Sequence, residues 1–468
     1  MADSTEFRSW LESRVTGPGN DDVWAVGETV VTRRQLTERV AYEREALRAR
    51  SITEGSAVAV QMMPSFTMLS TVFALWSTGA QVQLLDPRLT RVETVRLLEL
   101  CEPQFHITSS ELGGVFSSFR DETPVEVVRL RNGRPATSGH PLVQFSSGST
   151  GLPKVIGRTD ASLHAELKRF ARLPEMPRAG ERVLLLSSIM HSFGLIGGVL
   201  HGLDVGAPVH FSSRPQAREL VRMLAGREIS AVFGVPLHFG LLSRVPELPE
   251  LPSLRLAVSG GEVLDASVYE EFKAAYGIAI GQAYGMTETG IIATDLGGRY
   301  GPPAVGEVVP GLSTDVRGGT LRVRLPESPY LYADRADRYE DGWLDTKDRC
   351  SVRAGSGALE IAGRADSLVA VGGLKVDLTE VEQVLTEHPL IEEAVVVFGD
   401  SIEAHVVTSG ELSRGELLGW CRERLASYKM PRAFHYVAKL PRTPNGKLVR
   451  NRELLHTAHG RRPKSAVS

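Results

Sequence analysis

A loop of small hydroxylated residues and glycines follows an apolar run near the end of the first third of the chain. The stretch from Val143 to Lys154 reads VQFSSGSTGLPK. Its hydroxylated and glycine positions are Ser146, Ser147, Gly148, Ser149, Thr150 and Gly151. Backbone N–H groups and hydroxyls in such a loop can surround phosphate oxygens, and the lysine adds positive charge. The pattern favours phosphate binding, with a flexible turn as the alternative. It is not a Walker A loop, because GxxxxGK[ST] occurs nowhere in the sequence.

A second short segment combines an aromatic ring, glycines, threonines and a carboxylate. It runs from Gln282 to Gly290 and reads QAYGMTETG, with Tyr284 and Gly285 near its start. The tyrosine can stack on a base, Thr287 can bond to a phosphate, and Glu288 can hold Mg²⁺ beside that phosphate. The segment favours a nucleotide site, and a strand-to-helix turn with a threonine cap is the alternative.

These two segments and three later ones resemble the adenylate-forming superfamily in order and approximate spacing. The later segments are GWLDTKD, then GRAD…GGLKV…EVE, and finally PRTPNGK, so that the resemblance covers nearly the whole chain. The superfamily contains acyl- and aryl-CoA ligases, adenylation domains of nonribosomal peptide synthesis and firefly luciferase. The resemblance implies that a carboxylate attacks the α-phosphate of ATP, pyrophosphate leaves, and a thiol then attacks the acyl-AMP. The cofactors implied are ATP and Mg²⁺.

The resemblance also implies roles for single residues. Lys447 resembles the catalytic lysine that bridges the carboxylate and the α-phosphate, and Asp348 resembles the aspartate that accepts hydrogen bonds from the ribose hydroxyls. Arg364 resembles the partner of that aspartate on the ribose side. The chain departs from the family pattern at Lys347, where glycine is usual. If this position has a positive φ, a lysine there costs on the order of 1 kcal/mol.

Other matching positions complete the implied nucleotide site. The run SGGE, which contains Gly261 and Glu262, resembles the family segment that lies against adenine, where glycines permit a close approach. Lys375 occupies a position where relatives often carry a polar or basic side chain near the nucleotide.

The resemblance further implies two domains that change their relative orientation between the two half-reactions. Asp366 matches the hinge residue, and Gly372 and Gly373 suit the wall of a tunnel for the thiol, with a β-turn as the alternative. We expect a large ATP- and acid-binding domain over residues 1–365 and a small, mobile α+β lid domain with the catalytic lysine over residues 366–455. Residues 456–468 are expected to form a flexible tail.

The acid pocket is the least specified part of the site. His191 resembles the histidine of acyl- and aryl-CoA ligases, in which an imidazole or a nearby aromatic ring gates the carboxylate pocket, and we count it among the catalytic candidates. A core histidine bonded to the backbone is the alternative. The expected apolar wall consists of Phe193, Val235, Pro236 and Met286. Amino-acid-activating members of the superfamily that the chain resembles usually carry an aspartate in this segment, which pairs with the substrate's α-ammonium. None occurs between Ser187 and Gly202, so an ammonium buried there would lack its partner. An aryl or medium acyl acid is therefore favoured.

The acceptor and two rival functions stay open at this level. The thiol can belong to CoA or to the phosphopantetheine of an acyl or peptidyl carrier protein. One rival is a freestanding amino-acid adenylation enzyme that loads a carrier protein. The other is a degenerate nucleotide-binding protein without activity, which the lysine at position 347 would suit.

The elements that must position these residues follow an α/β pattern. Short apolar runs such as VAVQM, VQLLD and AVFGVP alternate with helix-like segments up to about residue 290, which predicts layered, mostly parallel sheets. Gly-punctuated strands over 305–365 predict a more antiparallel, small barrel-like part. From residue 366 the pattern predicts strand, helix, two strands, helix and strand, enough for an independent small domain.

Composition narrows the class of protein. The 53 Lys and Arg against 56 Asp and Glu give a net charge of −3, which disfavours nucleic acid as a partner. Three distant cysteines without a CxxC pair indicate neither a disulfide framework nor a thiolate zinc site, and they fit a reducing cytoplasm. The uncharged stretches 57–85 and 183–203 contain Pro, Gly, Ser, Gln or His, so we expect buried strands and helices instead of membrane spans.

Overall fold

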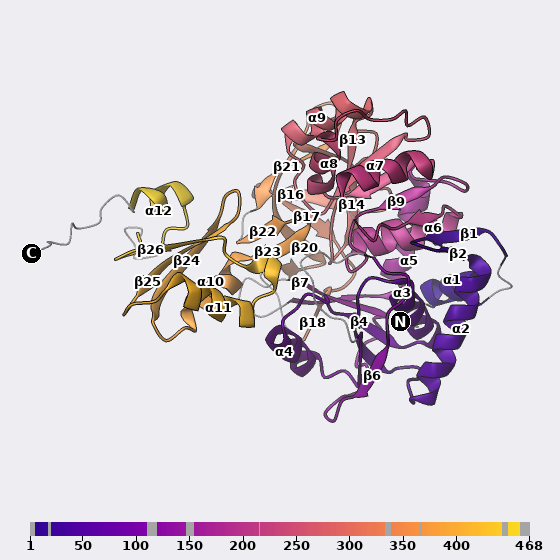
Figure 1. The fold of residues 1–468 in the computed structure, drawn as a ribbon, viewed down its shortest axis with the longest axis horizontal. Coiled ribbons are helices and arrows are strands. Elements are labelled where there is room, and N and C mark those ends of the chain that lie inside the picture. The colour runs from indigo at the N-terminus through magenta and orange to yellow at the C-terminus, as the bar shows by residue number, and fades with distance from the viewer. Residues whose placement is uncertain are drawn as a thin grey trace, which may run out of the picture. The chain divides into compact units, whose positions relative to one another are not determined.

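The computed structural model has mixed α/β architecture (Figure 1). It describes residues 5–16, 20–109, 119–146, 154–214, 216–332, 338–364, 367–441 and 448–458. The chain divides into two compact units. Of the described residues, the second unit holds those from Ser367 onward, together with Arg88–Leu97 and Lys154, and the first unit holds the rest.

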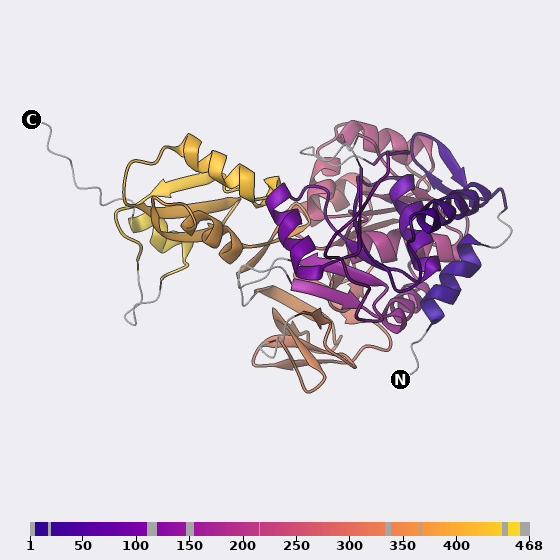
Figure 2. The same ribbon diagram turned by 90° about the horizontal axis from the view of Figure 1, so that it is seen from below.

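The first unit contains a long mixed sheet. Its parallel half is, in spatial order, β1 (Val23–Val26), β10 (Val209–His210), β9 (Val183–Leu185), β11 (Ala231–Gly234), β12 (Leu256–Gly260) and β13 (Ile280–Met286). Its antiparallel half continues with β14 (Gly290–Asp295), β15 (Ala304–Val308), β21 (Leu359–Arg364), β20 (Trp343–Val352), β17 (Thr320–Arg324) and β16 (Thr314–Arg317). At the edges, β2 (Val30–Thr32) pairs with β1, and β19 (Tyr339–Glu340) pairs with β20. The predicted antiparallel part over 305–365 is confirmed, but antiparallel pairing begins earlier, with β14 at Gly290. Figure 2 shows the same strands from a second direction.

A second sheet in the first unit is mostly parallel. Its spatial order is β18 (Tyr330–Leu331), β8 (Lys154–Arg158), β7 (Leu142–Ser146), β4 (Gln81–Leu84), β3 (Ala57–Gln61), β5 (Phe105–Thr108) and β6 (Glu126–Arg129). Helix α3 (Phe66–Thr78) connects β3 to β4, so the uncharged stretch 57–85 is the strand, helix and strand that its sequence predicts. Ser65 caps the start of this helix and Gly79 ends it in the left-handed conformation. Almost all of its side chains are buried, which explains why it is apolar on every side.

The remaining helices of the first unit cover these sheets. They are α1 (Glu6–Val15), α2 (Arg33–Ala49), α5 (Asp160–Arg172), the π-helix η1 (Phe193–Leu200), α6 (His201–Val205), α7 (Ala217–Gly226), α8 (Pro236–Ser243) and α9 (Ala266–Tyr276). Helix α4 (Arg91–Cys101) begins in the second unit, which contains Arg88–Leu97, and ends in the first. The central strands of the long sheet are buried on both faces. In β9, for example, Leu184 packs in the cluster of α7, α8 and α9, whereas Leu185 packs in the core that contains α3. Burial on both faces accounts for the continuous apolar runs that mark these strands in the sequence.

The second unit is a small α+β unit. Its elements are β22 (Leu368–Val371), β23 (Leu374–Asp377), α10 (Leu378–Thr386), β24 (Ile391–Phe398), β25 (Ile402–Thr408), α11 (Arg414–Arg424), the 3-10 helix η2 (Ser427–Lys429), β26 (Ala433–Tyr436) and α12 (Arg452–Ala458). Strand β25 pairs antiparallel with β24 and parallel with β26. The predicted order of strands and helices is confirmed, and the structure adds β23 and α12, which the sequence pattern did not indicate.

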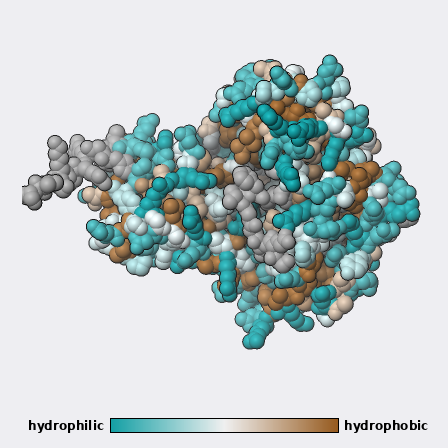
Figure 3. Space-filling view, viewed as in Figure 1, coloured by the Kyte–Doolittle hydropathy of each residue, from teal (hydrophilic) through white to brown (hydrophobic). Residues whose placement is uncertain are grey.

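Hydrophobic residues appear in separate patches among hydrophilic ones on the face drawn in Figure 3. Within the described ranges, no helix combines the length and the hydrophobicity needed to cross a bilayer.

Candidate active site

The parallel strands of the long sheet end together at one edge. The last paired residues are Leu185 with Phe233, Gly234 with Ser259, and Gly260 with Ala283. Ligands of open α/β sheets bind outside such carboxyl ends. The predicted site residues that follow or end these strands are His191, Phe193, Val235, Pro236, Gly261, Glu262, Tyr284 and Gly285. The topology therefore brings most of the predicted nucleotide and acid residues of the first unit to one edge.

A pair of hydrogen bonds connects the second sheet to this edge. The side-chain amide of Gln144 on β7 donates to the carbonyl oxygen of Met190 at 2.8 Å and accepts from the hydroxyl of Ser192 at 3.0 Å. Both polar side chains are buried. Ser146 ends β7 two residues after Gln144, so the serine- and glycine-rich loop begins beside the segment that follows β9. Sequence reasoning did not identify Gln144 or Ser192, whose role depends on a contact between distant segments.

The rest of that loop is only partly described. Residues 147–151 lie outside the described residues, and of Ser146 only the backbone is described. Lys154 begins β8 and is only 5% exposed.

An aromatic stack forms one wall at the edge. Phe193 begins the π-helix η1 and stacks on Phe233 with ring centroids 5.5 Å apart and planes 14° apart. A Cβ atom at Gly260 would lie 2.9 Å from the Phe193 ring, so this close approach requires glycine. Short π-helical segments occur often at functional sites.

The four predicted wall residues do not share one apolar cluster. Phe193 packs against the cluster of β11 and β12, whereas Met286 belongs to the cluster of the antiparallel half. Val235 and Pro236 are buried at the start of α8.

The segment from Gln282 to Gly290 forms a β-hairpin. Its residues belong to β13, a turn at Thr287–Thr289 and the start of β14, so the alternative of a strand-to-helix turn is wrong. Glu288 is 6% exposed, and its Oε1 accepts a hydrogen bond from the Tyr330 hydroxyl at 3.1 Å. Burial and the charge of Glu288 raise the pKa of Tyr330, which therefore stays a hydrogen-bond donor at neutral pH.

A buried ion pair holds this hairpin in place. Arg158 on β8 and Glu166 on α5 lie 2.7 Å apart, with each side chain 1% exposed. Glu166 also accepts a hydrogen bond from the backbone N–H of Ile291 at 3.1 Å, and Arg158 donates to the carbonyl oxygen of Thr287 at 3.5 Å. Gly290 has φ +72°, and a Cβ atom there would lie 2.2 Å from the Glu166 carboxylate. The glycine in the motif is thus required by this ion pair, which sequence reasoning missed because no local motif marks it.

Asp348 and Tyr284 lie together although 64 positions separate them in the sequence. The Tyr284 hydroxyl donates a hydrogen bond to the carboxylate of Asp348, which is 6% exposed. In the β20–β21 ladder Asp348 is also the cross-strand partner of Arg364, of which only the backbone is described. The predicted base-stacking ring and the predicted ribose carboxylate are therefore neighbours.

Lys347 has φ +61°, so the positive φ considered for this position, where the family usually has glycine, is present. Its ammonium lies 2.9 Å from Oδ2 of Asp345, and its backbone N–H donates to Oδ1 at 2.9 Å. Burial raises the pKa of Asp345, but the two hydrogen bonds from Lys347 outweigh burial and hold this pKa below its usual value. The ion pair offsets part of the backbone cost and leaves Asp348 hydrogen-bonded to Thr346 through its backbone N–H.

The predicted residues of the second unit are described in part. Lys375 lies half-buried on β23, and Gly372 and Gly373, with φ +57° and +83°, form the turn of the β22–β23 hairpin. The hinge candidate Asp366 and the candidate catalytic Lys447 lie outside the described residues.

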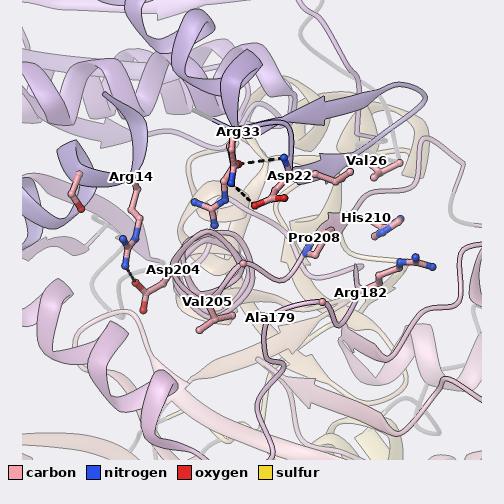
Figure 4. A pocket seen from close by; sticks show the side chains of 15 residues that line it. Arg14, Asp22, Val26, Arg33, Ala179, Arg182, Asp204, Val205, Pro208 and His210 are labelled. Carbon is pink, nitrogen blue, oxygen red and sulfur yellow. Dashed lines mark hydrogen bonds and ion pairs between the residues drawn. The ribbon is translucent and has the colours of Figure 1, made fainter. Parts of the chain in front are cut away.

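A separate cavity of about 820 Å³ lies elsewhere in the first unit (Figure 4). Arg14, Arg33, Arg182 and His210 are among its lining residues, and none of its lining residues is one that the motifs singled out. Arg14 is paired with Asp204 at 3.0 Å, as Figure 4 shows. Burial lowers the pKa of His210 to about 4, so this side chain is neutral at pH 7. The cavity shares no residue with the candidate active site.

Sequence comparisons identify the family. The family described as AMP-binding enzyme matches residues 11–326, and the AMP-binding enzyme C-terminal domain matches residues 380–447. The chain belongs to the AMP-binding enzyme family.

Characterised relatives are similar over most of this AMP-binding enzyme. The p-hydroxybenzoic acid–AMP ligase FadD22 of Mycobacterium tuberculosis is 30% identical over 90% of this chain, which spans 64% of the length of FadD22. The 2-succinylbenzoate–CoA ligase of Bacillus licheniformis is 25% identical and covers 95% of this chain and 98% of its own. A structure of the o-succinylbenzoate CoA synthetase MenE of Bacillus subtilis has the same fold, with a TM-score of 0.83 at 24% identity over 96% of this chain and 98% of that one.

The close approach of Glu166 to Gly290 predicts that an alanine at position 290 lowers the stability of the protein strongly. We expect Gly290→Ala to lower the stability of the protein by about 1–3 kcal/mol more than Gly277→Ala. Gly277 has a similar φ of +70°, but nothing lies within 4 Å of the Cβ position. Thermal denaturation of both variants measures the difference. Equal losses would show that the ion pair does not constrain the hairpin.

The positive φ of Lys347 predicts an order of stabilities. Lys347→Gly relieves the backbone cost of about 1 kcal/mol but loses a partly exposed ion pair worth about 0–1 kcal/mol. Lys347→Ala loses the ion pair and keeps the backbone cost. In thermal denaturation we therefore expect the glycine variant to match wild type and the alanine variant to be less stable. An alanine variant at least as stable as the glycine variant would contradict this view.

Proposed function

We propose that this AMP-binding enzyme is an ATP-dependent acid–thiol ligase. It activates an aryl or medium acyl carboxylic acid as acyl-AMP, releases pyrophosphate and transfers the acyl group to a thiol. The observation that carries the proposal is the hydrogen bond between Tyr284 and Asp348 at the carboxyl edge of the parallel strands. The Tyr284 ring can stack on a base, and the Asp348 carboxylate can accept hydrogen bonds from ribose hydroxyls. Tyr284 lies on β13, the strand that pairs with β12, and β12 contacts Phe193 at Gly260.

The nucleotide half of the proposed site takes in the residues that the family motifs single out. We assign the triphosphate to the serine- and glycine-rich loop 146–151 and Lys154, and the base and ribose to the edge residues. These are Gly261, Glu262, Tyr284, Gly285, Asp348 and Arg364, with Lys375 near the nucleotide. Glu288 is the proposed Mg²⁺ ligand, because a carboxylate oxygen is a preferred ligand of that ion, and Thr287 bonds to phosphate beside it. The cation would neutralise phosphate charge during the attack.

The acid half favours an aromatic acid. The Phe193–Phe233 stack offers a flat apolar surface, and two hydroxyls near it are buried. These hydroxyls belong to Ser187 and Ser259, and among the described residues neither has a hydrogen-bond partner, so both can bond to polar groups of a ligand. The names of the relatives FadD22 and 2-succinylbenzoate–CoA ligase both refer to aryl acids. His191, two residues before Phe193 in the sequence, is the proposed pocket histidine.

The lid and acceptor follow the family pattern. We assign residues 1–365 to ATP and acid binding and residues 366–455 to a lid that turns at Asp366. The expected tail cannot begin at residue 456, because helix α12 extends to Ala458. Lys447 acts in adenylation, and the Gly372–Gly373 turn faces the thiol of CoA or of a carrier-protein phosphopantetheine. Arg450, three residues after Lys447, is fixed to Glu382 on α10 at 2.7 Å, which anchors the end of the lysine motif.

Exchange of labelled pyrophosphate into ATP tests the proposed reaction. The panel contains benzoate, p-hydroxybenzoate, 2-succinylbenzoate, octanoate and several L-amino acids. We expect at least one aryl or acyl acid to support exchange at least about tenfold faster than any amino acid, because the pocket segment offers no carboxylate for an ammonium. Exchange confined to amino acids would establish the amino-acid adenylation enzyme instead, and no exchange with any acid would support a degenerate nucleotide-binding protein.

The same assay separates the role of Lys447 from a general loss of charge. We expect Lys447→Ala to slow exchange by about 10³-fold, while transfer from supplied acyl-AMP to the thiol stays within about threefold of wild type. Lys439→Ala is the matched control, since it removes an exposed lysine from the same unit. If both half-reactions survive in Lys447→Ala, the assignment of this lysine is wrong.

A further inference from the structure

Three histidines and a glutamate converge in the second unit. Glu403 and His405 stand two positions apart on β25, so their side chains share one face of the sheet. His435 is the direct partner of His405 on the neighbouring strand β26, and α12 contributes His456. One nitrogen or oxygen atom from each of the four side chains lies within 4.8 Å of all the others.

The position of the cluster is unusual for a sheet face. The alternate residues of β25, Ile402, Ala404 and Val406, pack in the apolar core with α10 and α11. On the opposite face Glu403 is 6% exposed and His405 is fully buried. A carboxylate and imidazoles at such positions are costly to bury unless they bond to partners or to a cation.

The rings already face one another. His405 and His435 are stacked with centroids 4.6 Å apart, and His456 lies edge-on to them at 5.5 and 5.1 Å. In tetrahedral coordination with metal–nitrogen distances of about 2.0–2.1 Å, ligand atoms stand roughly 3.3 Å apart. Small side-chain rotations would close the present spacing to that value. Because His456 remains 40% exposed, an ion has an entry path.

Hydrogen bonds orient the carboxylate of Glu403. Arg452 donates to Oε1 of Glu403 at 2.7 Å, and Nε2 of His456 lies 2.8 Å from Oε2. Nε of Arg452 also donates to both oxygens, at 3.1 and 3.2 Å, so the arginine fixes the carboxylate as an outer partner while Oε2 stays in contact with His456.

We propose that Glu403, His405, His435 and His456 form a four-coordinate site for a divalent first-row transition metal, with Zn²⁺ as the ion that best suits three imidazoles and one carboxylate. Imidazole-rich donor sets select zinc and its neighbours over Mg²⁺ and Ca²⁺. Four protein ligands are typical of a structural site. The ion would fasten α12 to β25 and β26, the elements that precede and follow the lysine motif in the sequence. A metal-free ion-pair and stacking cluster that holds α12 is the alternative.

Cobalt titration of the metal-free full-length protein tests the site. We expect one equivalent of Co²⁺ to produce the visible absorption of tetrahedral Co²⁺, and Zn²⁺ to displace it. His435→Ala and His456→Ala should each weaken binding at least about tenfold. His388→Ala is the matched control, because it removes a histidine that stacks on Trp420 in the same unit outside the cluster. It should bind Co²⁺ as wild type does.

A folding readout accompanies the titration. His456 lies on an exposed terminal helix, so His456→Ala is expected to fold even if His435→Ala does not. Zn²⁺ should raise the melting temperature of wild type by several degrees and leave that of His456→Ala unchanged. The proposal is overturned if wild type shows no tetrahedral cobalt spectrum, if the spectrum has thiolate character, or if His456→Ala binds as tightly as wild type.

Discussion

Parallel strands end at the same edge of a sheet, and the candidate active site depends on this constraint. Strands β9, β11, β12 and β13 deliver segments that are far apart in the sequence to one line of strand ends. The hydrogen bonds of Gln144 to Met190 and Ser192 bring the second sheet to the same place. These bonds connect the strand that leads into the serine- and glycine-rich loop with the segment that follows β9. The geometry that the chemistry needs is therefore set by sheet topology.

Two ion pairs then fix local backbone geometry that the sheet topology alone does not determine. The ion pair of Arg158 and Glu166 holds the turn of the β13–β14 hairpin, and that turn carries Thr287 and Glu288. Breaking one partner of such a pair typically costs about 3–5 kcal/mol, because the other charge stays buried. At Lys347 the chain accepts an unfavourable φ and offsets it with an ion pair to Asp345. Rigid support of this kind suits a reaction that relies on positioning and electrostatics.

Much of the fold could be predicted because the signals are local. Apolar runs marked the parallel strands, Gly-punctuated strands marked the antiparallel part, and the ordered motifs identified the family. What the sequence did not reveal depends on distant partners, such as Gln144 with Ser192 and Arg158 with Glu166. The sequence also did not show that Met286 and Phe193, both predicted for the wall of the acid pocket, belong to different apolar clusters, because the hairpin carries Met286 into the cluster of the antiparallel half. The histidine cluster escaped notice since its members come from two strands and a short helix.

The central claim is that Tyr284 and Asp348 bind the nucleotide. Calorimetric titration of AMP into wild type and Asp348→Asn measures this most directly, with thermal denaturation of both proteins as a check on folding. Loss of a charged acceptor for two hydroxyls should weaken AMP binding by about 1.5–3 kcal/mol, which is roughly 10- to 150-fold. Equal affinities for AMP in two equally stable proteins would contradict the claim.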